Sequence, residues 1–267
     1  MCDLKTLMSL KGRVAAVTGG AGHLGRTMLN ALAEVGADVV VIDIKQEYVD
    51  PVVSELKDKW GCRAMGIAVD LEDSDAAAKV PEKIVAEMGR LDILVNNAAF
   101  VGTSGLTGWN EPFERQSVET WKRALTVNLT AIFALTQAAA PYLRKSGHGS
   151  IVNVASIYGI VGPDFRLYEG LHMSNPAAYA ASKGGVVQFT RWSSTVLAPE
   201  IRVNAITPGG IFRNQDPKFV GRYESRTPMK RMAREEDFIG AVVYLASDLS
   251  QYVTGQNLVV DGGFSVW

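Results

Sequence analysis

Short apolar segments rich in β-branched residues alternate along this chain with longer stretches of helical spacing. Residues 38–43 (Asp-Val-Val-Val-Ile-Asp) lack the alternation of a half-solvated strand, so they predict a strand that is buried on both faces. Seven such segments occur, and helical crossovers between buried strands are typical of a doubly wound parallel sheet. The predicted strands are 13–18, 38–43, 63–69, 91–95, 150–154, 201–206 and 256–260.

No Pro/Gly/Ser-rich linker and no internal repeat divides the 267 residues. The sequence therefore predicts a single α/β domain spanning 1–267, with a doubly wound, seven-stranded parallel sheet and helices on both faces. The predicted helices are 24–35, 73–88, 117–144 and 177–197.

Charge and composition narrow the class of partner. Hydrophobic residues make up 47% of the chain, charged residues 21%, and the net charge is -1. A nearly neutral chain lacks the Lys/Arg excess that a nucleic acid or an anionic membrane demands, so we expect a small-molecule partner and neither of these.

Cysteine, histidine and the N-terminal residues carry no special signal. Cys2 and Cys62 lie far apart without CxxC spacing, and the three histidines are not arranged with them as ligands, so we expect reduced thiols and no metal. Residues 1–13 contain no apolar signal-peptide core, and no later run approaches a bilayer span. The sequence predicts a soluble, cytoplasmic protein.

A glycine-rich turn follows the first predicted strand. Gly20-x-Gly22-x-x-Gly25 fits the dinucleotide fingerprint in its required strand-turn-helix context. The glycines let the backbone approach a pyrophosphate, and the amide groups at the helix start bind the anion. The alternative is a glycine-rich turn without a ligand.

Asp43 ends the second predicted strand, 24 positions after Gly19. A carboxylate there can accept hydrogen bonds from the adenosine ribose hydroxyls and would repel the 2′-phosphate of NADP, which favours NAD. Two alternatives stay open: Lys45 lies close enough to bind a phosphate, and Asp43 could simply cap the following turn.

Among the eight tyrosines only Tyr179 has a lysine four residues later, Lys183, and both fall on one face of a predicted helix. A free tyrosine has a pKa of about 10, so forming the phenolate at pH 7 requires roughly 4 kcal/mol. The Lys183 ammonium and a nearby nicotinamide cation are expected to lower that pKa. The spacing alone is weak evidence, because it also arises by chance.

Further motifs accompany these residues in order: Asn96-Asn97-Ala98-Ala99 after the fourth strand, Asn128 within Val127-Asn128-Leu129, Ser156 after the fifth strand, and 204–209 (Asn-Ala-Ile-Thr-Pro-Gly) after the start of the sixth. With them the chain resembles the short-chain dehydrogenase/reductase family, in its compact single-domain branch with a Rossmann fold. The resemblance runs from about Gly12 to Gly263.

The resemblance implies roles for the matching positions. Tyr179 is the general base or acid, and Lys183 supports it and binds the nicotinamide ribose. Ser156 donates a hydrogen bond to the substrate oxygen, and Asn128 holds a water that connects Lys183 to solvent. Ser156 could instead be a strand-end cap and Asn128 a helix-bending amide. The implied NAD contacts are Gly19, Gly22, His23, Leu24, Gly25, Asp43, Ile44, Asp70, Leu71, Asn97, Ala98, Tyr179, Lys183, Pro208, Gly209 and Ile211.

Three features depart from the family pattern. His23 stands where glycine is usual; we favour a side chain that points to solvent, and the alternative is that it covers the phosphates. Arg213 stands where a threonine often contacts the cofactor. Ser156 and Tyr179 are 23 positions apart, which is longer than usual. Segments at about 157–176 and 212–235 are therefore predicted to bind substrate, although the first could be a surface or oligomer-contact loop.

The polar side chains of the first insertion, Asp164, Arg166, Glu169 and His172, suit a sugar, polyol or sugar-acid derivative, because an apolar acyl chain would leave them unpaired. The sequence thus predicts an oxidoreductase that transfers a hydride between NAD(H) and a polar secondary alcohol or ketone. The alternatives are a 3-oxoacyl thioester reductase and, more remotely, a non-catalytic nucleotide-binding protein.

The resemblance also implies a homo-oligomer, a homotetramer or a dimer. The expected contact surfaces are 117–144, 177–197 and the apolar C-terminal residues 264–267.

Overall fold

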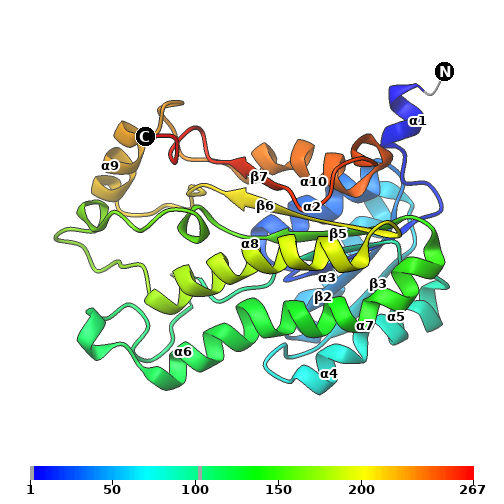
Figure 1. The fold of residues 1–267 in the computed structure, drawn as a ribbon, viewed down its shortest axis with the longest axis horizontal. Helices are drawn as coiled ribbons and strands as arrows, with labels where there is room; N and C mark the ends of the chain where they lie inside the picture. Colours follow the sequence, from blue (N-terminus) through cyan, green and yellow to red (C-terminus); the bar gives the residue numbers. More distant parts are fainter. Residues whose placement is uncertain (1–2, 102–103) are drawn as a thin grey trace.

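A computed structural model describes residues 3–101 and 104–267, so the prediction about Cys2 lies outside the described residues. Seven parallel strands form one sheet in the order β3-β2-β1-β4-β5-β6-β7 (Figure 1), which confirms the predicted doubly wound fold. The strands are β1 (Val14–Thr18), β2 (Asp38–Asp43), β3 (Ala64–Ala68), β4 (Ile93–Asn96), β5 (Gly149–Val154), β6 (Ile201–Pro208) and β7 (Asn257–Val260).

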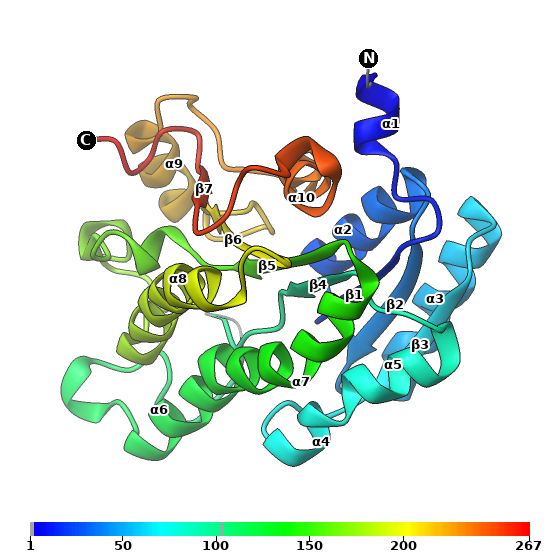
Figure 2. The same cartoon turned by 45° about the vertical axis from the view of Figure 1, so that its right-hand side comes forward.

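Helices cover both faces of the sheet. Figure 2 shows α2 and α10 on one side and α5 and α7 on the other, and each side has its own buried apolar cluster. The α-helices are α1 (Leu4–Met8), α2 (His23–Glu34), α3 (Gln46–Trp60), α4 (Ser74–Ala78), α5 (Val80–Met88), α6 (Val118–Leu125), α7 (Ala131–Ser146), α8 (Ala177–Leu197), α9 (Pro217–Arg226) and α10 (Ile239–Ala246). The π-helical turn is η2 (Thr126–Thr130), and the 3-10 turns are η1 (Phe113–Arg115), η3 (Ile157–Gly159), η4 (Phe165–Leu167), η5 (Glu235–Phe238) and η6 (Asp248–Ser250).

Two helices that the sequence predicted as continuous are interrupted. The predicted helix 73–88 breaks at Lys79 into α4 and α5, because Pro81 in the first turn of α5 has no N–H to continue an earlier helix. The predicted helix 117–144 is divided by the π-helical turn η2 between α6 and α7. The helix 177–197 has the predicted bounds.

The stretch from α6 through α7, residues 118–146, is long and apolar enough to cross a membrane by length and composition. The expectation that no run approaches a bilayer span is therefore wrong for this segment. More than half of its most apolar window is buried inside the fold, where Leu135, Ala139 and Leu143 pack in the cluster beneath the sheet. Packing on the sheet accounts for its apolar character.

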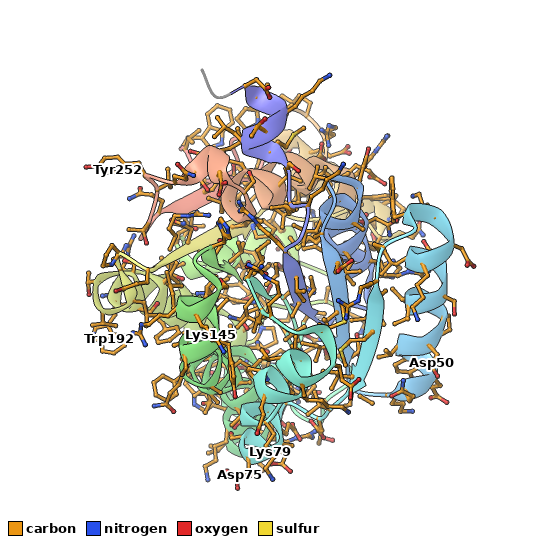
Figure 3. The ribbon with its side chains drawn as sticks, turned by 90° about the vertical axis from the view of Figure 1, so that its right-hand side faces the viewer. Asp50, Asp75, Lys79, Lys145, Trp192 and Tyr252 are labelled. Atoms are coloured by element: carbon orange, nitrogen blue, oxygen red, sulfur yellow. The ribbon has the colours of Figure 1, made fainter. Side chains whose placement is uncertain are left out.

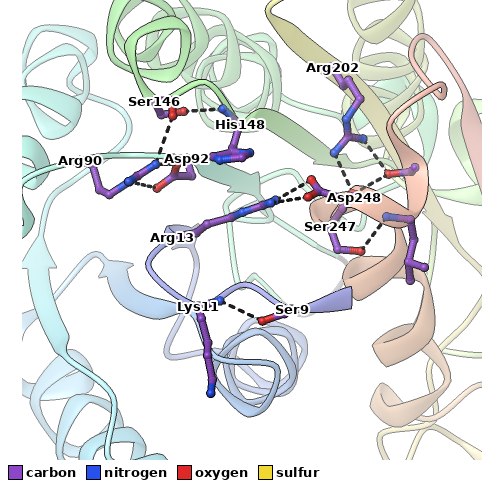
Figure 4. A network of polar contacts seen from close by, with 12 residues as sticks. Ser9, Lys11, Arg13, Arg90, Asp92, Ser146, His148, Arg202, Ser247 and Asp248 are labelled. Atoms are coloured by element: carbon purple, nitrogen blue, oxygen red, sulfur yellow. Dashed lines mark hydrogen bonds and ion pairs between the residues drawn. The ribbon is translucent and has the colours of Figure 1, made fainter. Parts of the chain in front are cut away.

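Arginines close the amino end of the sheet (Figure 4). Arg13 forms two hydrogen bonds with the Asp248 carboxylate, at 2.9 and 2.6 Å, and Arg90 forms two with Asp92, at 2.8 and 2.6 Å. Asp92 is fully buried and also accepts the Val14 amide at 2.8 Å. Arg13 and Arg90 thus each have a carboxylate partner, whereas Arg202, at the start of β6, donates to the Leu245 and Ser247 carbonyls and to the Ser250 hydroxyl. These contacts tie the strands and loops together at this end.

The carboxyl ends of the strands carry the predicted site residues. The glycine turn follows β1, Asn97 follows β4 and Ser156 follows β5. Chain connections diverge to opposite sides between β1 and β4, which is where doubly wound sheets bind their ligands. In Figure 1 the segment between β5 and α8, helix α9 and the C-terminus gather beside that end.

Candidate active site

The glycine turn brings β1 and α2 into close contact. Gly19 has φ of +62°, a left-handed conformation that favours glycine. A Cβ atom on Gly25 would lie 2.1 Å from the Gly19 carbonyl oxygen, so no other residue fits there without moving the backbone. A Cβ on Gly19 would lie 3.0 Å from Ala98, which places the chain after β4 directly against the turn.

The start of α2 is open to an anion. Gly22 is the N-cap residue and supplies no capping side chain, and the first turn contains no acidic residue. The first amide groups of a helix have no partner within the helix, and they carry the positive end of its dipole. This cradle fits the pyrophosphate of a dinucleotide. His23, the first residue of α2, is exposed, and whether it contacts the phosphates stays a prediction.

Asp43 joins the end of β2 to the glycine turn. Its carboxylate accepts the Ala21 amide at 2.9 Å and the Ile44 amide at 2.8 Å. Lys45, which the sequence left open as a phosphate ligand, pairs with Glu47 at 3.3 Å. An open groove of about 380 Å³ adjoins the carboxylate. Its lining is Ala21, Gly22, Arg26, Asp43, Glu47, Tyr48, Pro51 and Val52.

The predicted cofactor contacts Asn97, Asp70 and Leu71 follow β4 and β3 at the same end of the sheet. The Asn97 amide donates to the carbonyls of Thr18 at 2.9 Å and Gly19 at 3.2 Å, so it braces the glycine turn. Asp70 is exposed after β3 and accepts the Glu72 amide, whereas Leu71 is buried.

The predicted contacts after β6 lie in a braced segment. The Gly209 amide donates to the Val260 carbonyl at 2.9 Å, directly after the last residue of β6, Pro208. The Ile211 carbonyl accepts a hydrogen bond from the Gln215 side chain at 2.7 Å.

Tyr179 and Lys183 lie one turn apart on α8, as predicted. The Lys183 Nζ atom is 5.9 Å from the centre of the Tyr179 ring. Lys183 is 2% exposed, and its ammonium donates to the Val154 carbonyl at 2.7 Å. Burial lowers the pKa of Lys183 to about 8, so most molecules carry the ammonium at pH 7.

The pKa of Tyr179 is raised, not lowered as the sequence led us to expect. Burial is the largest cause, and it outweighs the lowering by the Ser156 hydrogen bond and by the Arg213 guanidinium. The physical reason is that the free-energy cost of desolvating the phenolate exceeds the stabilisation that the nearby donor and positive charge of the protein provide.

Ser156 begins the turn η3 directly after β5. Its hydroxyl accepts the Tyr158 amide at 3.2 Å, and its hydrogen bond lowers the pKa of Tyr179. Ser156 is therefore a cap, as the alternative interpretation held, and it also faces the Tyr179 hydroxyl.

Asn128 lies in the π-helical turn and is fully buried. Its amide oxygen accepts the Phe100 N–H at 2.7 Å, and its amide nitrogen donates to the Phe100 carbonyl and to Ser182 at 3.1 and 3.2 Å. The side chain ties the segment after β4 to α8, two elements that carry predicted site residues. Such π-helical turns occur frequently at functional sites.

The insertion before Tyr179 folds onto α9 and the C-terminal residues. Four rings from these three segments form what we call the aromatic lobe, with neighbouring centroids 5.3, 5.9 and 4.5 Å apart. The lobe consists of Tyr168, Phe219, Tyr223 and Phe264.

Two of the four polar residues of the insertion pair with charged neighbours, and the other two are exposed. Asp164 pairs with Arg226 and, at 2.8 Å, with Arg166. Glu169 and His172 are exposed. Asp164 and Arg166 are thus occupied by charged neighbours, and a substrate role for the four side chains stays a prediction.

Tyr158 is a side chain near Tyr179 that sequence reasoning missed. Its hydroxyl lies 2.8 Å from the Tyr168 hydroxyl. Burial is the main cause that raises the pKa of Tyr158, and the Tyr179 phenol raises it further. Burial also raises the pKa of Tyr168. The hydroxyls of Tyr158 and Tyr168 are therefore both protonated at pH 7. The signal that could have found Tyr158 is its position two residues after Ser156, in the turn η3 that Ser156 caps.

A family described as enoyl-(acyl carrier protein) reductase matches residues 19–265 of the chain. The 3-oxoacyl-[acyl-carrier-protein] reductase FabG of Thermotoga maritima is 35% identical over 266 residues, with 97% of this chain and 100% of that protein covered.

Two solved structures share the fold over nearly the whole chain. A gluconate 5-dehydrogenase from Burkholderia cenocepacia J2315, in complex with NADP and tartrate, is 28% identical with a TM-score of 0.88, and 99% of this chain and 100% of that chain are covered. A short chain dehydrogenase from Leptospira borgpetersenii with bound NAD+ is 32% identical with a TM-score of 0.84, and the coverage is 99% and 96%.

Proposed function

This chain belongs to the short-chain dehydrogenase/reductase family, whose members act on CH–OH groups with NAD or NADP, and on that premise we propose that it is an NAD-dependent dehydrogenase of a polar secondary alcohol. The observation that carries the proposal is the placement of Ser156, Tyr179 and Lys183 beside the dinucleotide cradle at the carboxyl end of one sheet.

Tyr179, Ser156 and Lys183 have different roles in the proposed reaction. In the oxidation direction the substrate hydroxyl proton passes to Tyr179, and the carbinol hydrogen leaves with its electron pair as hydride. Ser156 donates a hydrogen bond to the substrate oxygen and holds it in position. Lys183 keeps a positive charge beside the ring of Tyr179 and binds the ribose. The nicotinamide, when bound, supplies the hydride acceptor and a further positive charge.

We assign Asn128 a positioning role. Its side-chain amide is occupied by Phe100 and Ser182, so a water that relays protons from Lys183 would be held by the main chain of the π-helical turn. The side chain fixes that turn against α8 and thereby sets the place of the water.

The preference for NAD rests on Asp43. Its carboxylate is fixed by two backbone amides beside an open groove, where it can accept hydrogen bonds from ribose hydroxyls. A 2′-phosphate in that position would meet a negative charge, and Lys45 is already paired with Glu47.

The proposed substrate is a sugar, polyol or sugar-acid derivative that the two insertions, 157–176 and 212–235, help to bind. Support comes from the hydroxyl groups of Tyr158 and Tyr168, which hydrogen-bond to each other at 2.8 Å and leave one O–H donor that a polar substrate can pair with and an acyl chain cannot. The similarity to a gluconate 5-dehydrogenase is consistent with this substrate class.

A second candidate is reduction of 3-oxoacyl thioesters, which the 35% identity to the Thermotoga maritima reductase favours. The two candidates differ in substrate polarity and in cofactor, since Asp43 opposes NADPH. Both differ from a non-catalytic nucleotide-binding protein in requiring Tyr179.

We also propose a cytoplasmic homotetramer or dimer. Large apolar side chains are exposed on α6, α7 and α8, and Figure 3 shows Trp192 at the outer surface of the molecule. Trp192 stacks on Phe189, whose ring meets Phe133, so α7 and α8 share one exposed aromatic face. A second copy of the chain would cover that face.

The experiment is a panel of sugar acids, polyols and 3-oxoacyl thioesters, each measured with NAD(H) and NADP(H). The proposal expects NAD reduction by at least one polar alcohol and negligible thioester turnover. Turnover of thioesters with NADPH, without activity on any polar alcohol, would select the second candidate instead.

A further inference from the structure

Arg213 stands in the segment after β6, and it is held there by several contacts. Its amide donates to the Gln215 side chain at 2.7 Å, and Gln215 in turn donates to the Ile211 carbonyl. The neighbouring Phe212 amide donates to the Ala233 carbonyl at 2.9 Å. The backbone that presents Arg213 is therefore braced rather than loose.

The guanidinium of Arg213 is only partly occupied. Its Nε atom pairs with Glu235 at 3.0 Å, and the side chain is 38% exposed. Among the residues that the structure describes, the two terminal nitrogens have no hydrogen-bond partner. A guanidinium with an open edge binds a carboxylate through two parallel hydrogen bonds.

Arg213 lies at the same edge of the sheet as the reacting group. It follows β6, which pairs with β5, and Ser156 follows β5. The Arg213 charge is also among the causes that lower the pKa of Tyr179, the proposed proton acceptor. A small molecule whose hydroxyl contacts Tyr179 can therefore extend a carboxylate toward Arg213.

Arg226, on α9, is not available in the same way. It pairs with Asp164, and its guanidinium lies 5.6 Å from the centre of the Phe264 ring. Its contacts hold the aromatic lobe together, whereas those of Arg213 leave hydrogen-bond donors open.

We infer that Arg213 anchors the carboxylate of the substrate, so that the preferred substrates are small hydroxy acids with further hydroxyl groups rather than neutral sugars or acyl thioesters. The inference rests on the proposed function, because it assumes that Tyr179 receives the hydroxyl proton. It makes Arg213 a specificity-determining residue and gives a reason for arginine at this position.

The kinetic test compares a sugar acid with its neutral counterpart, gluconate with glucitol, at saturating NAD. For Arg213→Gln we expect kcat/KM on gluconate to fall about 30-fold, which corresponds to the loss of one charge-assisted hydrogen-bonded pair. The kcat/KM on glucitol should change less than about threefold. Arg213→Lys should recover part of the loss as a point charge. Arg191→Gln, an exposed arginine on α8, is the matched control and should leave both substrates unchanged.

A binding test does not depend on turnover. Tartrate is titrated into the wild-type protein loaded with NADH and into both Arg213 variants, and calorimetry measures its affinity. The inference expects about 30-fold weaker binding to Arg213→Gln, and no change for Arg191→Gln.

Two results would overturn the inference. One is an Arg213→Gln variant whose KM for NAD rises while its preference for gluconate persists, since Arg213 would then contact the cofactor. The other is tartrate binding that does not respond to Arg213. If no polar alcohol is oxidised by the wild-type protein, the proposed function fails, and the tartrate titration still decides the role of Arg213.

Discussion

At the amino end of the sheet the guanidinium groups of Arg13 and Arg90 each meet a carboxylate (Figure 4), whereas at the carboxyl end the ammonium of Lys183 is buried with a carbonyl oxygen as its partner. Arg13 and Arg90 are thus matched by carboxylates, whereas the charge of Lys183 is disfavoured by burial. Arg202 at the amino end also has a pKa that burial lowers, and it donates to carbonyl and hydroxyl oxygens, so the contrast holds for Arg13 and Arg90 and not for every charge. A buried charge at the carboxyl end lies where a ligand binds, and perturbed groups of this kind cluster at functional sites. Substitutions at the two ends should therefore have separable effects on stability and activity.

The largest expected effect is on activity. Tyr179→Phe removes the proton acceptor and should lower kcat by about a thousandfold or more, while the thermal unfolding midpoint stays close to that of the wild type. NADH formation at 340 nm and calorimetry measure the two quantities. Tyr252→Phe, a fully exposed tyrosine, is the control. Equal turnover by wild type and Tyr179→Phe would remove Tyr179 from the mechanism.

The next effect is on stability, at the opposite end. Asp92→Ala leaves the buried Val14 amide and the Arg90 guanidinium without their acceptor, and it should reduce the free energy of unfolding by about 3 kcal/mol. Urea unfolding measures this change, with the exposed Asp75→Ala as control. We expect the kcat of the folded variant to stay near the wild-type value. A large loss of kcat with unchanged stability would contradict the division between the two ends.

A third change alters cofactor choice. Asp43→Asn keeps the size of the side chain, loses one of its two hydrogen bonds from backbone amides, and removes the charge that would repel a 2′-phosphate. The ratio of kcat/KM for NAD to that for NADP should fall about 30-fold, or about 2 kcal/mol. Asp50→Asn, an exposed carboxylate on α3, should not change the ratio. A wild-type preference for NADP would itself contradict the role given to Asp43.

The sequence predicted the sheet well because buried parallel strands are apolar on both faces, as in β2. It also predicted the cradle, since Gly19 and Gly25 are demanded by backbone contacts that leave a local pattern. Helix α10 left no such pattern: it is a short, almost entirely apolar segment containing Val242 and Val243, and a run of that length also reads as a buried strand.

The substrate side of the site was harder to predict than the cofactor side. The neighbours of Tyr158 are decided by how the insertion packs on α9, and charges such as Asp164 are neutralised by partners distant in the sequence, here Arg226. The direction of the Tyr179 pKa also depended on burial, which spacing along the chain does not reveal.

At the carboxyl end the buried charge of Lys183 lowers the stability of the fold, and the variant Lys183→Met tests this directly. Burial lowers the pKa of Lys183 from 10.5 to about 8. The protonated lysine therefore lowers the free energy of unfolding. This destabilisation is complete below pH 8 and absent above pH 10.5.

Removing the charge should therefore raise the free energy of unfolding of the cofactor-free protein by about 2 kcal/mol at pH 7, after the loss of the hydrogen bond to Val154 is subtracted. The gain should shrink as the pH approaches 10, and the exposed Lys145→Met should show neither effect. Urea unfolding at the two pH values makes the measurement. A Lys183→Met variant less stable than the wild type at pH 7 would contradict the claim.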